Sequence, residues 1–187
     1  LGDVYKRQQE IQQRKQETRR RERRKRRIAE DSRRKRNYEQ NRNTMIREKL
    51  TGVGVAMITP FTSDGRVDYQ ALARMIDYVI EGGVDYIVAL GTTAETPTLY
   101  MPERAVIAMF ITNHIAGRVP LVMGCGGNST SEVLDQLREF DLRGADAILS
   151  VTPYYNKPSQ EGLYQHFRTV SEHSPVPVIL YNICLLY

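Results

Sequence analysis

Cysteine, histidine and long apolar runs are all scarce in this chain, and each scarcity argues against a class of protein. Cys125 and Cys184 lie in separate segments without the spacing of a metal site or disulfide framework, which favours buried thiols in a reducing cytoplasm. The three histidines all fall in expected helices, so we predict no metal site. No run of 18 apolar residues occurs, and the first residues lack the apolar core of a signal peptide, so we predict no membrane association.

Nucleotide-binding motifs are also missing or incomplete. No Gly-Lys-Ser/Thr phosphate loop occurs. The glycine-rich segment 124–128 lies between an expected strand and an expected helix, as a dinucleotide fingerprint would. It lacks the full spacing, and no acidic residue ends a following strand at the required distance. We therefore interpret it as a close backbone turn and predict no cofactor.

The net charge of +5 is the sum of two opposite parts. Residues 1–49 carry a net charge of +11, whereas residues 50–187 carry −6. The basic segment has almost no aliphatic residues and cannot bury a core. It fits a nucleic-acid-binding arm, a solvated charge run, or sequence outside the native protein, since Met45 resembles a natural start. We expect residues 1–44 to be a disordered, non-native leader, with nucleic-acid binding as the less favoured alternative.

From residue 53 onward, the chain alternates between short apolar runs and stretches with helical periodicity. The periodicity predicts five strands, at residues 53–58, 84–90, 119–123, 147–151 and 176–181. It predicts four intervening helices, at residues 69–80, 102–116, from 129 onward, and from 159 to about 173. Ser129 to Glu132 form a capping-box sequence, and Ser159 is a second candidate N-cap.

The nearly continuous apolar strands indicate a parallel α/β sheet that is covered on both faces. An open doubly wound sheet and a (β/α)8 barrel both fit this pattern. Hydroxyl or amide groups follow every strand: Thr59, Thr92 and Thr93, Asn128, residues 152–155, and Tyr181 with Asn182. In a barrel these ends converge on one site. We therefore favour a (β/α)8 TIM barrel, truncated to about its first five strands and four helices.

Hydroxyl groups dominate the chemistry available at these strand ends. Tyrosine has an ordinary pKa near 10 and is a poor base alone, but chained phenol and threonine hydroxyls can pass protons in both directions. Backbone amides in the turn from Gly91 to Ala94 could hold a carboxylate. Turn capping by Thr92 and Thr93, and interface packing by Tyr154 and Tyr155, are the simpler alternatives. Together these groups suggest keto-acid chemistry, which often uses a lysine Schiff base.

The segments GTTAETPTL (91–99), VTPYYNKPSQEGLYQHF (151–167), VILYN (178–182) and TGVGVAMITPF (51–61) resemble the 4-hydroxy-tetrahydrodipicolinate synthase (dihydrodipicolinate synthase) family. The resemblance runs from about residue 50 to 182. It implies a class I aldolase-type TIM barrel that condenses pyruvate with L-aspartate 4-semialdehyde in lysine and diaminopimelate biosynthesis. It also implies a homotetramer built from tight dimers. N-acetylneuraminate lyase, or another pyruvate aldolase, is the alternative within the superfamily.

The same resemblance implies roles for individual residues. Thr92 and Thr93 match the threonines that bind the pyruvate carboxylate, and Thr92 also matches a member of the proton relay. Tyr155 matches the relay tyrosine that reaches the neighbouring subunit's site, and Tyr181 matches the tyrosine beside the Schiff base. Three further residues fall where many members bind the inhibitor lysine: Asn128, Glu132 and Tyr154.

The chain departs from the family pattern at three places. Ala94 stands where many members have glycine, and residues 183–187 replace a Pro-x-Arg-Thr type sequence. The Schiff-base lysine, expected on the next strand, is absent from the chain. Lys157, the only lysine after Lys49, lies in a polar loop without an apolar wall to lower its pKa. We therefore expect an N-terminal fragment, inactive by itself, with a non-native end at residues 183–187.

Overall fold

A computed structural model describes residues 45–182 and a few positions of the basic segment. The chain divides into two units, residues 1–44 and 45–187. In the first unit the described residues are all helical: Arg21, Lys25, Ile28, Ala29 and Ser32. The expectations for the rest of residues 1–44, and for residues 183–187 with Cys184, lie outside the described residues.

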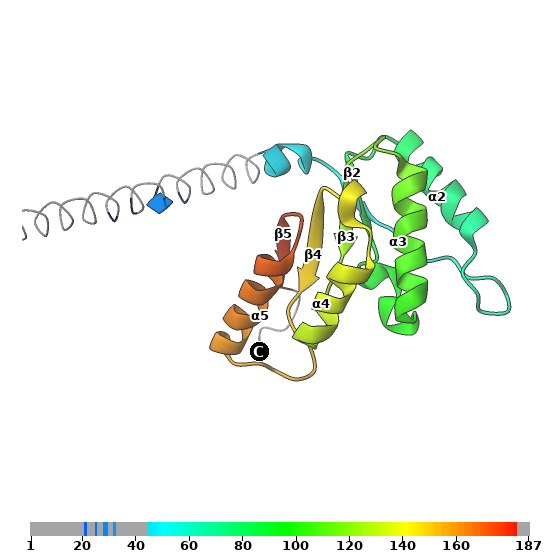
Figure 1. Ribbon diagram of the computed structural model, residues 1–187. Helices are drawn as coiled ribbons and strands as arrows, with labels where there is room; N and C mark the ends of the chain where they lie inside the picture. Colours follow the sequence, from blue (N-terminus) through cyan, green and yellow to red (C-terminus); the bar gives the residue numbers. More distant parts are fainter. Residues whose placement is uncertain (1–20, 22–24, 26–27, 30–31, 33–44, 183–187) are drawn as a thin grey trace, which may run out of the picture. The chain divides into compact units, whose positions relative to one another are not determined.

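The second unit alternates strands and helices in the order that the sequence predicts (Figure 1). The strands are β1 (Gly54–Ala56), β2 (Tyr86–Ala89), β3 (Leu121–Gly124), β4 (Ala147–Val151) and β5 (Val178–Tyr181). The helices between them are α2 (Tyr69–Glu81), α3 (Met101–Ile115), α4 (Thr130–Glu139) and α5 (Gln160–His173). Short 3-10 helices are η1 (Thr92–Ala94), η2 (Thr96–Thr98) and η3 (Leu142–Gly144).

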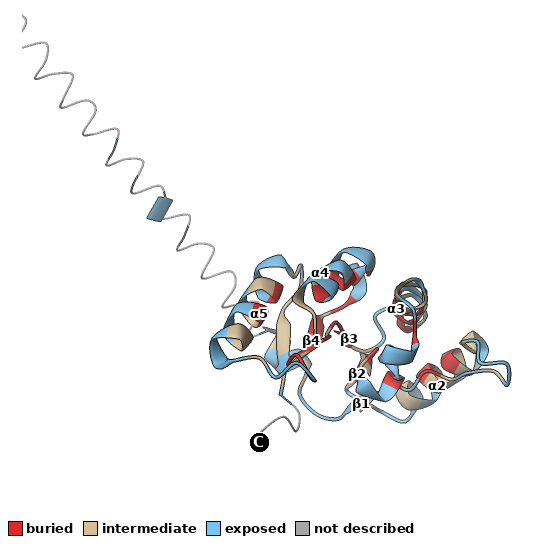
Figure 2. Ribbon diagram, turned by 90° about the horizontal axis from the view of Figure 1, so that it is seen from below, coloured by how far each residue is buried: buried red, intermediate tan, exposed pale blue. Residues whose placement is uncertain are grey.

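The five strands form one parallel sheet whose spatial order is also the chain order, β1-β2-β3-β4-β5. A doubly wound sheet reverses its strand order at a switch point, and no reversal occurs here. Because β-helix-β crossovers are right-handed, a sequential order places all the helices on one face, as Figure 2 shows. The fold is therefore a five-stranded part of a (β/α)8 barrel, as predicted.

The main hydrophobic core lies between the sheet and the helices. Alternate strand residues enter it, such as Ile87, Met123 and Ile148, because successive strand side chains point to opposite faces. Helix residues meet them from the other side: Leu72, Ile76, Ile107, Ile111, Val133, Leu137 and Val170. The intervening strand residues, such as Leu149, point to the opposite face, where the cavity described below lies.

The predicted residues Ser129 and Ser159 cap α4 and α5, and Asp68, which was not predicted as a cap, begins α2. The Asp68 carboxylate accepts from the Ala71 amide at 2.9 Å, and the Ser159 hydroxyl accepts from the Gly162 amide at 3.1 Å. The Ser129 hydroxyl accepts from the Glu132 amide at a longer 3.5 Å. These caps fix where α2, α5 and α4 begin, and therefore the length of the loops that follow the strands.

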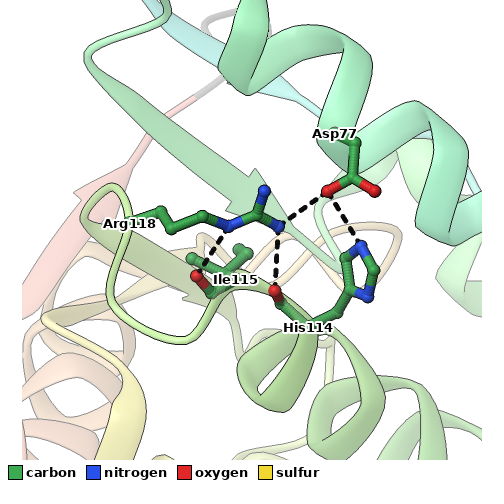
Figure 3. Close-up of polar contacts among 4 residues, drawn as sticks. All are labelled: Asp77, His114, Ile115 and Arg118. Atoms are coloured by element: carbon green, nitrogen blue, oxygen red, sulfur yellow. Dashed lines mark hydrogen bonds and ion pairs between the residues drawn. The ribbon is translucent and has the colours of Figure 1, made fainter.

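A polar cluster joins α2 to the end of α3 (Figure 3). Asp77 Oδ1 accepts from Arg118 Nη2 at 2.7 Å and contacts His114 Nε2 at 3.0 Å. Arg118 also donates to the carbonyls of His114, at 2.9 Å, and Ile115, at 3.2 Å. The His114 ring stacks on Phe110, with centroids 5.8 Å apart. Arg118 thus satisfies terminal carbonyls of α3 while holding α2 against it.

Asp77→Asn is expected to lower the thermal unfolding midpoint near neutral pH, and the difference from the parent chain should decrease as the pH falls. The hydrogen bonds from Arg118 and His114 hold the pKa of Asp77 below its ordinary value of 3.8. Because the folded-state pKa is the lower one, this stabilisation is complete above the ordinary value and is lost as pH falls through the folded-state value. Thermal scans of both proteins between about pH 7 and pH 2 test this. A midpoint difference that stays constant over this range would contradict it.

Candidate functional site

A cavity of about 440 Å³ lies at the carboxyl ends of the strands. Residues from the ends of β2, β3, β4 and β5 contribute to its wall: Leu90, Gly91, Thr92, Thr96, Pro97, Gly124, Gly126, Leu149, Val151, Tyr154 and Tyr181. Convergence of strand ends on one site is the feature that the barrel prediction required. Most of this wall is apolar, and the lining residues that carry a side-chain hydroxyl are Thr92, Thr96, Tyr154 and Tyr181.

The turn after β2 has an unusual backbone. Leu90 and Glu95 have φ values of 52° and 54°, in the left-handed region that side chains other than glycine rarely adopt. Between them, the Ala94 amide donates to the Gly91 carbonyl and the Glu95 amide donates to the Thr92 carbonyl, both at 3.1 Å. These bonds close the 3-10 turn that presents Thr92 and Thr93.

The hydroxyls of Thr92 and Thr93 make no hydrogen bond to another described residue. Turn capping by these side chains, the simpler alternative, therefore does not occur among residues 45–182. Thr92 lines the cavity, and Thr93 is exposed outside its wall. Ala94 is buried with an ordinary negative φ, so its methyl group needs no glycine-like conformation.

The glycines at the end of β3 and in the loop after it allow close backbone approach, as predicted. A Cβ on Gly124 would lie 2.0 Å from the Leu90 carbonyl oxygen. A Cβ on Gly126 would lie 2.8 Å from Val151 Cγ1 and 2.9 Å from the Val151 amide nitrogen. Both glycines line the cavity. Neighbouring strand ends can therefore approach closely, which brings the β2 turn beside the β3 loop.

The two adjacent tyrosines after β4 have different surroundings. Tyr154 contributes to the cavity wall, whereas Tyr155 is 90% exposed with φ of 68° and lies outside the wall. Asn156 holds this loop, since its amide donates to the Tyr154 carbonyl at 2.8 Å and its Nδ2 to the Asn128 carbonyl at 3.0 Å. The loop therefore directs Tyr154 and Tyr155 to different places.

The other predicted site residues surround this arrangement. Tyr181, on β5, lies in the wall, and its carbonyl accepts from the Thr152 amide at 3.0 Å. Asn128 lies before α4 and Glu132 lies in its first turn, and neither residue lines the cavity. Of the possible lysine-site residues, only Tyr154 lines the cavity. Lys157 is exposed and also lies outside the wall.

Thiol and metal chemistry have no support at this site. Cys125 is fully buried, and burial raises the pKa of its thiol far above the usual range, so it is not a ready nucleophile. Among the residues that the structure describes, no group of three His, Cys, Asp or Glu side chains could hold a metal ion.

No helix in the described part of the chain is long and apolar enough to cross a membrane.

Sequence reasoning missed three parts of the site. Thr96 and Pro97 line the cavity although only Thr92 and Thr93 were singled out in that segment. Thr59 was noted as a strand-end hydroxyl, but its partner was not foreseen: it donates to the Ala94 carbonyl at 2.8 Å. Their position could have indicated Thr96 and Pro97, because they follow the same strand as Thr92 and Thr93.

Comparisons with known proteins agree with this geometry. The model of the "Dihydrodipicolinate synthetase family" matches residues 49–186. The 4-hydroxy-tetrahydrodipicolinate synthase of Parabacteroides distasonis is 51% identical over 134 residues, which cover 72% of this chain and 45% of that protein. The enzyme of the same name from Flavobacterium psychrophilum is 54% identical over 136 residues, which cover 73% of this chain and 46% of that protein. The chain thus spans about half the length of the curated relatives it matches.

Solved structures show the same similarity. The 4-hydroxy-tetrahydrodipicolinate synthase of Methylacidiphilum fumariolicum SolV is 39% identical with a TM-score of 0.69, covering 72% of this chain and 45% of that one. The chloride-inhibited dihydrodipicolinate synthase of Acinetobacter baumannii, solved with pyruvate, is 45% identical with a TM-score of 0.68, covering 71% and 45%. The similarity therefore covers sequence and fold together.

Proposed function

Because this chain belongs to the dihydrodipicolinate synthetase family, we propose that it supplies the N-terminal part of a pyruvate-dependent lyase. The complete enzyme condenses pyruvate with L-aspartate 4-semialdehyde through a lysine Schiff base, in the cytoplasm. The observation that carries the proposal is the shared cavity: Thr92, Tyr154 and Tyr181 reach it from the ends of three different strands. Hydroxyls that converge in an apolar cavity suit proton transfer to and from a bound keto acid.

Each group has a part in this proposal. The turn of Thr92 and Thr93 binds the pyruvate carboxylate, and their hydroxyls are available because no described residue engages them. Thr92 and Tyr181 pass protons during Schiff-base formation and condensation. Tyr155 completes the relay of a neighbouring subunit within a homotetramer. Its 90% exposure supports this role, because a residue that crosses an interface must project from its own subunit.

The electrophile-forming lysine is supplied by a later strand that this chain does not contain. A Schiff base needs a lysine amine with a lowered pKa inside the cavity, and the exposed Lys157 does not line it. The chain alone is therefore inactive in this proposal. Asn128, Glu132 and Tyr154 form an inhibitory lysine site at the rim, where Asn156 links the Tyr154 loop to the Asn128 loop.

Supplying the missing part of the barrel tests the proposal. We expect lyase activity when the chain is co-produced with the complementary C-terminal segment of the Parabacteroides distasonis relative. Borohydride reduction in the presence of pyruvate should then attach a reduced pyruvate to a lysine of the added segment. Mass spectrometry of both segments locates the label.

Two controls decide the interpretation. The added segment with its strand-borne lysine changed to alanine should give neither label nor turnover, and the chain alone should give neither. Labelling of Lys157 in the isolated chain would refute its proposed inactivity. Turnover of N-acetylmannosamine, rather than aspartate semialdehyde, with pyruvate would instead assign the chain to the N-acetylneuraminate lyase branch.

A further inference from the structure

The turn that presents Thr92 and Thr93 is held in a conformation that its own sequence does not favour. Leu90 before it and Glu95 at its end both have left-handed backbones, with φ of 52° and 54°. Neither residue is glycine, so isolated peptides of this sequence would prefer other conformations. Such geometry persists only where surrounding structure imposes it. Some contact from outside the turn must therefore stabilise it.

Thr59 provides such a contact from another strand. Its Oγ1 donates to the Ala94 carbonyl at 2.8 Å, across 35 residues of sequence. Thr59 is only 4% exposed and Ala94 only 2%, so the bond is shielded from water. A buried carbonyl without this donor would lack a partner, and only the bond from the Glu95 amide to the Thr92 carbonyl would then oppose rotation of the peptide between Ala94 and Glu95. That rotation would change the turn directly after Thr93.

We propose that Thr59 is a positioning residue that holds the Thr92–Thr93 turn in the orientation required to bind a carboxylate. Its hydroxyl fixes the peptide between Ala94 and Glu95, and the Glu95 amide of that same peptide donates to the Thr92 carbonyl at 3.1 Å, closing the turn. The proposal rests on the proposed function, because it assumes that this turn binds the pyruvate carboxylate. Thr59 itself does not line the cavity, so it acts through the backbone alone.

The test compares three variants of the full 187-residue chain by amide NMR during pyruvate titration. Thr59→Val keeps the shape of the side chain and removes the hydroxyl, whereas Thr59→Ser keeps the hydroxyl. Thr112→Val is the matched control, because the Thr112 hydroxyl is buried without a hydrogen-bond partner among the described residues. Amide hydrogen exchange at Ala94 and Glu95 reports on the turn without any ligand.

We expect Thr59→Val to raise the pyruvate Kd by about fivefold or more and to accelerate exchange at Ala94 and Glu95. For Thr59→Ser and Thr112→Val, the pyruvate Kd and the exchange rates at Ala94 and Glu95 should both stay within about twofold of the values for the parent chain. If Thr59→Val has the same exchange rates and the same pyruvate Kd as the parent chain, the positioning role is overturned while the proposed function stays intact. An equal loss of pyruvate affinity in Thr59→Val and Thr59→Ser would also overturn the positioning role, since the packing of the side chain rather than its hydroxyl would then matter.

Failure of the proposed function gives a different result. If pyruvate shifts neither the Thr92 nor the Thr93 amide of the parent chain, the carboxylate site is refuted, and the exchange rates still decide whether Thr59 holds the turn. If Thr59→Val does not fold alone, the enzyme paired with the complementary segment is used. There the substitution should raise KM for pyruvate more than it lowers kcat, and an unchanged KM would overturn the role.

Discussion

Gly124→Ala is expected to destabilise the chain by about 3 kcal/mol, the upper end of the usual range for overpacking. The added methyl would lie 2.0 Å from the Leu90 carbonyl oxygen and 2.9 Å from the Gly91 nitrogen. These are backbone atoms, so no flexible side chain can move aside, and the β2 and β3 ends would have to separate. Because small domains are stable by only about 5–15 kcal/mol, the loss should be plain in urea unfolding curves.

Gly91→Ala is the matched control for this substitution. Gly91 also lines the cavity, but its Cβ would meet only Val88 Cγ1, at an ordinary 3.8 Å. Its φ of −79° and ψ of −168° suit any residue. We expect a change of less than about 0.5 kcal/mol. Similar urea midpoints for the two alanine variants would show that the β2 and β3 ends are not packed as closely as described.

Tyr181→Phe is expected to lower kcat of the paired enzyme by about 10²- to 10⁴-fold, the usual contribution of a positioned proton-transfer group. The substitution removes only the hydroxyl, so the cavity wall keeps its shape and the pyruvate KM should change little. Steady-state kinetics with the complementary segment in excess provide the measurement.

Tyr78→Phe controls for loss of a tyrosine hydroxyl elsewhere. Tyr78 lies on α2, is exposed and does not line the cavity. Its removal should leave kcat and KM unchanged. A Tyr181→Phe enzyme with parental kcat would exclude the tyrosine from the relay, which would then consist of Thr92 and Tyr155.

Helix positions were predicted more accurately than strand lengths. The expected helix at 102–116 is Met101–Ile115, a shift of one residue, because caps and apolar periodicity are local signals. The expected strand at 53–58 is only Gly54–Ala56. Val53 and Ile58 are apolar yet exposed, so their hydrophobicity did not indicate burial in the core. A strand ends where its neighbour stops pairing, and that depends on another part of the chain.

The candidate site was predicted in part for the same reason. Thr92, Tyr154 and Tyr181 were all chosen from the sequence and all line the cavity. Tyr155, Asn128 and Glu132 lie outside its wall. Tyr155 was expected to serve a neighbouring subunit's site and the other two an inhibitory lysine site, so these roles stay predictions. The left-handed backbone at Tyr155 has no sequence signal, since tyrosine there is neither glycine nor asparagine.

By itself, the sequence determined the alternation of strands and helices and the concentration of hydroxyl groups at strand ends. Both follow from local properties: hydrophobic period, capping residues and the residue types after each apolar run. Only the tertiary structure decided which hydroxyls share the cavity and how the Thr92 turn is held. Those outcomes depend on parallel register, on the close approach at Gly124 and on the bond from Thr59 to Ala94, each of which joins residues far apart in the chain.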